Sequence, residues 1–124
     1  MIVGVGVDVV SVARLARALD DIATQVFTPA ELAACADRAD RLDALAARFA
    51  AKEACLKALN AGVAEGMLRQ VEILSSPSEA PTLQLSGALD ARARTAGVRR
   101  AHVSLSHQEG VAAAVVILEG SATC

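Results

Sequence analysis

The order of apolar and polar positions divides the first half of the chain into one strand and three helices. Residues 2–10 form a valine-rich apolar run, which predicts a buried strand. Ser11 is a candidate N-cap for a helix over residues 12–22. The longest helix is predicted over residues 42–59, because residues of high helix propensity fill this segment.

The short helix between these two begins with a clear start signal. Thr28 is expected to be its N-cap, Pro29 to occupy the first helical position, and Glu31 to complete a capping box. This helix is expected to end near Arg38.

The second half of the chain alternates between short strands and one helix. A helix is predicted over residues 86–96, where Gly97 ends it. Strands are predicted over residues 68–74, 82–85, 101–105 and 111–118, with a loop at 106–110. The complete order predicts an α+β fold with a largely antiparallel sheet, and the length of 124 residues fits one domain, 1–124.

Composition and charge narrow the class of protein. Hydrophobic residues make up 54% of the chain and charged residues 21%, which excludes a disordered chain. Aromatic residues make up only 2%, so the core is aliphatic and a base-stacking platform is not expected. The net charge of -2 also argues against a nucleic-acid partner, although a local cluster of cations could still bind one small anion.

Cysteine usage and hydropathy give indications of the cellular location of the protein. Cys35, Cys55 and Cys124 are odd in number and fit neither a CxxC nor a zinc pattern, so we expect reduced thiols in a cytoplasmic protein. Residues 1–10 lack the basic leader of a signal peptide. No apolar run reaches the roughly 18 residues of a membrane span, so no membrane association is expected.

The first candidate for chemistry is the motif that ends the N-terminal strand. Gly4 and Gly6 precede Asp8, but Val9 occupies the place of the third glycine in a dinucleotide fingerprint. What remains is a carboxylate at the end of an apolar strand, just before a helix. Asp8 could therefore be a metal ligand or simply a helix cap.

The second candidate lies on the long predicted helix. At about 100° per residue, Lys52 falls within an apolar seam and Glu53 at its edge, with Lys57 one turn further on. An ordinary i,i+4 pair, worth about 0.2–0.5 kcal/mol, would explain Glu53 and Lys57. It does not explain Lys52, because a charge facing the core needs a partner or a ligand.

The third candidate is the segment that ends the strand predicted over residues 101–105. Alternation places Ser104 and Ser106 on one face of the strand, and His107 follows at its end. A lone histidine is more often a structural hydrogen-bonding group than a ligand or catalyst. A serine hydrolase is conceivable, but the chain has no nucleophile elbow, and a strand would point Ser106 and His107 apart.

Together these features resemble one protein family. Residues 2–14, 45–59 and 102–119 are similar, in order and spacing, to the small holo-[acyl-carrier-protein] synthases, the short branch of the phosphopantetheinyl transferases. The resemblance implies a 4′-phosphopantetheinyl transferase fold, with the sheet packed against a long central helix. It implies transfer of 4′-phosphopantetheine from coenzyme A to a serine of an apo acyl carrier protein, with release of adenosine 3′,5′-bisphosphate. It also implies a homotrimer whose active sites lie between subunits.

The resemblance assigns catalytic roles to three residues. Asp8 and Glu53 match the family's Mg²⁺ ligands, and Mg²⁺ prefers one or two carboxylates together with water and phosphate. Lys57 matches a lysine that contacts the phosphates and can donate a proton to the leaving group. Either Glu53 or a metal-bound water would take the proton of the carrier serine.

The resemblance also assigns binding roles. Arg48 and His107 match positions near the nucleotide end of coenzyme A, Pro81 a loop near the adenine, and Gly62 a loop near the phosphates. Arg14 resembles the basic residue on the helix that meets the acidic carrier protein.

The sequence departs from the family pattern at one loop, and one alternative function stays open. The family often has Gly-Thr-Gly after the long helix, whereas residues 60–62 are Asn-Ala-Gly, which bears on the coenzyme A contacts. The alternative function is a non-catalytic α+β oligomer that binds a nucleotide or a carrier. Such a protein has no need for two carboxylates at a phosphate, so Asp8 and Glu53 discriminate between the two functions.

Overall fold

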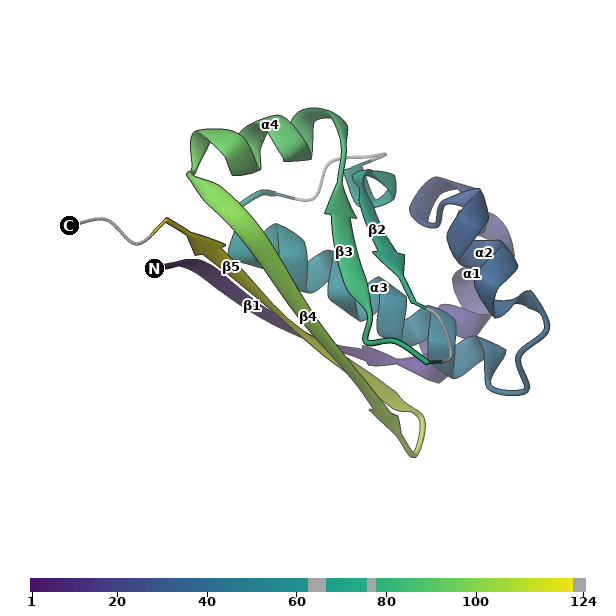
Figure 1. Ribbon diagram of the computed structural model, residues 1–124. Helices are drawn as coiled ribbons and strands as arrows, with labels where there is room; N and C mark the ends of the chain where they lie inside the picture. The colour runs from purple at the N-terminus through teal and green to yellow at the C-terminus, as the bar shows by residue number, and fades with distance from the viewer. Residues whose placement is uncertain (63–66, 76–77, 122–124) are drawn as a thin grey trace.

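The computed structural model describes residues 1–62, 67–75 and 78–121. Its elements follow the chain in the order β1 (Ile2–Ser11), α1 (Val12–Val26), α2 (Pro29–Ala36), α3 (Arg41–Ala58), η1 (Met67–Gln70), β2 (Val71–Leu74), β3 (Thr82–Leu85), α4 (Gly87–Thr95), β4 (Val98–Gln108) and β5 (Val111–Gly120) (Figure 1). The predicted α+β class is therefore confirmed.

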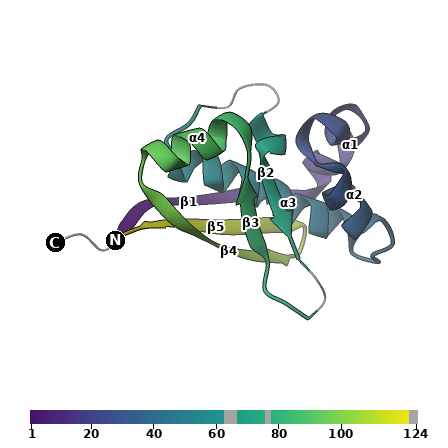
Figure 2. The same cartoon turned by 45° about the horizontal axis from the view of Figure 1, so that its top comes forward.

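The fold has two antiparallel sheets, and both pack against the long helix α3. The larger sheet has the strand order β1-β5-β4, and β2 pairs with β3 in the smaller one. Helix α3 packs across one face of the larger sheet and contacts mainly β1 and β5 (Figure 1). Helices α1 and α2 lie at the end of the molecule opposite to the N-terminus (Figures 1 and 2). None of the helices in the described part of the chain is long and apolar enough to cross a bilayer.

Small residues let α3 approach β1 closely. The helix buries a series of alanines, Ala44, Ala46, Ala47, Ala50, Ala51, Ala54 and Ala58. On the strand, a Cβ atom at Gly4 would lie 2.1 Å from the carbonyl oxygen of Ala58. Only glycine permits this backbone contact, so the glycines of β1 fix the distance between the strand that carries Asp8 and the helix that carries Glu53.

Two predicted boundaries are wrong, the end of the first helix and the start of the second strand. Helix α1 continues to Val26 because its buried positions keep helical spacing and no breaker precedes Pro29. The segment 67–70 forms a 3₁₀ turn, so the strand predicted to start at Leu68 begins only at Val71.

The loop predicted over residues 106–110 is mostly strand. β4 extends to Gln108, and a two-residue turn of Glu109 and Gly110 leads into β5. Both turn residues have positive φ, 51° and 80°, as a type I′ hairpin requires. His107 is consequently held within the ladder, opposite Ala112.

Candidate functional site

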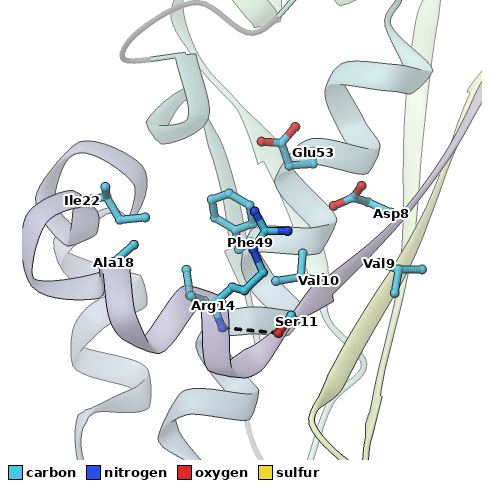
Figure 3. A pocket seen from close by; sticks show the side chains of 10 residues that line it. Asp8, Val9, Val10, Ser11, Arg14, Ala18, Ile22, Phe49 and Glu53 are labelled. Carbon is cyan, nitrogen blue, oxygen red and sulfur yellow. Dashed lines mark hydrogen bonds between the residues drawn. The ribbon is translucent and has the colours of Figure 1, made fainter.

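Asp8 and Lys57 meet where β1 passes over α3. Lys57 Nζ lies 3.0 Å from Asp8 Oδ1 and donates a second hydrogen bond to the carbonyl of Val7 at 3.1 Å. Glu53 lies one turn earlier on α3 and lines the same pocket as Asp8 (Figure 3). The structure therefore brings together the three residues that were predicted to be catalytic.

Asp8 is not a helix cap. The N-cap of α1 is Ser11, whose hydroxyl oxygen accepts from the backbone N–H of Arg14 at 3.3 Å. The carboxylate of Asp8 is thereby left for Lys57 and for the pocket beside it, which removes the structural alternative raised by the sequence.

The electrostatics around Glu53 favour a cation. Burial raises the pKa of the Glu53 carboxyl, and the negative charge of Asp8 raises it further, while Lys57 acts in the opposite direction. Two carboxylates that destabilise each other's charge are suited to a divalent cation. Among the described residues there is no cluster of three or more histidine, cysteine or acidic side chains that could hold a metal. A pair of carboxylates is the kind of ligand set that Mg²⁺ uses, since it keeps its other positions for water and phosphate.

A pocket of about 330 Å³ opens beside the two carboxylates. Arg14 reaches into it from α1, towards Phe49 (Figure 3). The rest of its wall is mainly apolar and is formed by Val9, Val10, Leu15, Ala18, Ile22 and Phe49. One end of this carboxylate pocket is thus charged and the other is apolar.

A second pocket, of about 350 Å³, gathers the residues predicted near the nucleotide end of coenzyme A. Arg48, Pro81 and His107 all line it. Arg48 is only 2% exposed, and it donates from Nη2 to the hydroxyl of Ser75 at 2.7 Å. Its Nε is the one buried side-chain nitrogen or oxygen in the described chain without a hydrogen-bond partner. A buried guanidinium with a free donor is suited to an anionic ligand.

The rim of this nucleotide-side pocket carries further charges. Arg38, a lining residue that the sequence did not single out, holds Asp40 through two contacts of 2.8 and 2.9 Å. This pairing lowers the pKa of Asp40. His107 lies 3.7 Å from Asp40 and 3.9 Å from Asp43, so its ring faces the start of α3. Ser106 points to the other face of β4, which gives no support to a serine–histidine hydrolase.

Lys52 belongs to the core and not to either pocket. Its ammonium lies 2.7 Å from Glu31 Oε1, and both side chains are fully buried. The other Glu31 oxygen accepts from the N–H of Ile73 at 3.0 Å, and the carbonyl of Leu68 accepts from Lys52. The buried charge that the sequence left unexplained therefore has an acidic partner, on the helix whose capping box was correctly predicted.

The turn after α3 explains one departure from the family pattern. Asn60 has φ of 53°, and the N–H of Ala61 donates to the carbonyl of Leu56 at 2.9 Å. Asparagine is one of the few residues that tolerate this conformation, in which glycine is usual. Gly62 follows the turn and lines neither the carboxylate pocket nor the nucleotide-side pocket.

Within one chain, the two pockets lie apart. The carboxylate pocket is lined by Phe49 and Glu53 of α3, the nucleotide-side pocket by Ala47 and Arg48. The strands that contribute to them, β1 and β4, are separated by β5.

Comparison with known proteins relates this arrangement to a family. Residues 4–116 match the 4′-phosphopantetheinyl transferase superfamily. A holo-[acyl-carrier-protein] synthase of Anaeromyxobacter sp. (strain K) is 46% identical over 98% of both chains. The crystal structure of the synthase from Neisseria meningitidis superposes with a TM-score of 0.85, at 31% identity, over 96% of this chain and 99% of that one. The Helicobacter pylori synthase in complex with coenzyme A superposes with a TM-score of 0.76, at 30% identity, over 93% and 99%.

These similarities span nearly the whole chain, and they confirm the resemblance drawn from its motifs. The chain belongs to the 4′-phosphopantetheinyl transferase superfamily, and within it to the holo-[acyl-carrier-protein] synthases.

Proposed function

We propose that this protein transfers 4′-phosphopantetheine from coenzyme A to a serine of an apo acyl carrier protein, with Mg²⁺, and releases adenosine 3′,5′-bisphosphate. The observation that carries the proposal is that Asp8 and Glu53 line one pocket, while Lys57 pairs with Asp8. A protein that only bound a nucleotide would have no reason to place two carboxylates there, since they repel phosphate.

The residues divide the chemistry between them. Asp8 and Glu53 would hold the Mg²⁺, which neutralises charge on the phosphoanhydride when bound. Lys57 carries an exposed ammonium on a flexible stem and would donate to the phosphates and to the leaving group. Glu53 would be one candidate group of this chain to take the proton of the carrier serine.

The proposed binding roles are divided between the two pockets. Arg48, His107 and Pro81 would receive the nucleotide end of coenzyme A, aided by the free Nε donor of Arg48. Arg14, at the exposed edge of the carboxylate pocket, would meet the acidic carrier protein. The role of Gly62 at the phosphates stays a prediction.

A homotrimer would unite the separated pockets, with the carboxylates from one subunit and the Arg48 side from its neighbour. The outer face of the larger sheet supports self-association, because β1 exposes a row of apolar side chains, Val3, Val5, Val7 and Val9. Val5 is 57% exposed, so Val5→Lys is expected to give soluble monomers without transferase activity. Light scattering would check the mass, and a trimeric, fully active variant would contradict the shared site.

A cytoplasmic location remains a prediction. It is supported by the free, buried thiols of Cys35 and Cys55.

The test of function is direct. The protein is incubated with coenzyme A, Mg²⁺ and candidate apo carriers, and the carrier is weighed by intact mass spectrometry. A gain of one phosphopantetheine is expected, and it should disappear with EDTA or with Glu53→Gln. Full activity of Glu53→Gln would overturn the metal assignment, and binding without transfer would favour the non-catalytic alternative.

A further inference from the structure

The contact between Lys57 and Asp8 occupies an oxygen that a metal would need. Lys57 Nζ is 3.0 Å from Asp8 Oδ1 and is held from a second side by the carbonyl of Val7. The side chain of Asp8 is only 17% exposed, so its carboxylate has little freedom to turn towards a different partner.

We propose that Lys57 and the divalent cation compete for Asp8 Oδ1, so that cation binding releases the Lys57 ammonium towards the phosphates of the substrate. This inference rests on the proposed function and adds an order of events to it.

The charges of the site favour this order. With the ammonium paired to Asp8, the positive charges of Lys57 and Arg14 only balance those of the two carboxylates, so the site offers a diphosphate no net attraction. A divalent cation on the carboxylates makes the site positive and leaves Lys57 free. The phosphates are then attracted by two positive groups, so coenzyme A is expected to bind with or after the cation.

The packing allows Lys57 to move at little cost. Its side chain is 57% exposed, and an ion pair exposed to this degree is weak. Lys52, by contrast, is fully buried and bound to Glu31. Lys52 and Lys57 are the only lysines of the chain, which makes them a matched pair for an experiment.

Amine labelling followed by peptide mass spectrometry tests the release directly. The wild-type protein is labelled at fixed pH with a limiting acylating reagent, with and without saturating Mg²⁺. Labelling of Lys57 is expected to rise several-fold with Mg²⁺, while Lys52 stays protected as the internal control. Equal labelling of Lys57 in both conditions, under calorimetrically verified Mg²⁺ saturation, would overturn the proposal.

Calorimetry of Mg²⁺ binding separates competition from simple charge repulsion. Lys57→Met is expected to bind Mg²⁺ about two- to fivefold more tightly than the wild type, because an exposed pair no longer has to be broken. Arg14→Met removes a charge from the same pocket without removing a contact to Asp8, and should change the affinity less. If both variants change the Mg²⁺ affinity equally, the effect of Lys57 is only that of a nearby positive charge, and direct competition is contradicted.

The failure of this inference can be told from failure of the function. If phosphopantetheine transfer requires Mg²⁺ and Lys57 labelling does not respond, only the competition is wrong. If neither Mg²⁺ binding nor transfer is detected, the proposed function itself fails.

Discussion

Gly6 of β1 lies directly against the carbonyl oxygen of Ala54 in α3, so closely that a Cβ atom on Gly6 would be 1.8 Å from that oxygen. Asp8 lies two residues further along the strand, and Glu53 is the residue directly before Ala54 on the helix. The contact between a glycine and a helix backbone therefore sets how near the two carboxylate-bearing elements can come.

Gly6→Ala is expected to destabilise the protein by about 1–3 kcal/mol or more, because the methyl group meets backbone that cannot move aside. Gly62→Ala is the control, since a Cβ atom there would meet nothing within 4 Å. Thermal unfolding of both variants checks the prediction. An unchanged midpoint for Gly6→Ala would show that α3 can shift away from β1.

The buried pair of Lys52 and Glu31 is expected to behave as one unit. Lys52→Met or Glu31→Gln alone should cost about 3–5 kcal/mol, because each leaves a charge buried without its partner. The double variant should cost less than the sum of the two. Urea unfolding measures all three, and strictly additive losses would contradict the coupling.

Glu53 should make stability depend on pH in a defined direction. Its pKa is raised in the folded protein above the ordinary 4.5, so the folded state prefers the protonated form, and stability falls as pH rises through the raised pKa. Without divalent cations, Glu53→Gln should therefore unfold at a higher temperature than the wild type at neutral pH. The difference should vanish below about pH 4.5.

Added Mg²⁺ provides the control for that experiment. It should raise the unfolding temperature of the wild type more than that of Glu53→Gln, because only the wild type keeps both carboxylates. An equal response of the two proteins would argue that Glu53 is not a ligand.

Arg92 of α4 is expected to position the turn after α3. Its Nε donates to the carbonyl of Leu59 at 3.0 Å and its Nη2 to that of Asn60 at 2.6 Å. Arg92→Met should raise KM for coenzyme A more than it lowers kcat, since the predicted phosphate loop begins at this turn. Arg94→Met is the matched control, because Arg94 is 79% exposed and pairs only with Asp90 among the described residues. Equal kinetics of both variants would contradict the positioning role.

Local signals in the sequence were enough for most elements, whereas the roles predicted for Asp8, Glu53 and Lys57 came from the family resemblance. The capping box at Thr28 and the apolar seam of α3 act over a few residues, so periodicity and side-chain type reveal them. The end of β4 was missed because a Glu-Gly turn is a weaker signal for a two-residue hairpin than Asn-Gly.

The amino-acid sequence by itself determined the α+β order of elements, the family motifs and the residues that are proposed to bind a cation and phosphate. Only the tertiary structure decided that Glu31 neutralises Lys52, that Lys57 pairs with Asp8, and that Arg38 joins Arg48 at a separate pocket. The physical reason is the separation along the chain between the residues that interact. Helix caps and periodicity depend on neighbours along the chain, whereas ion pairs and pockets form only when packing brings distant segments together.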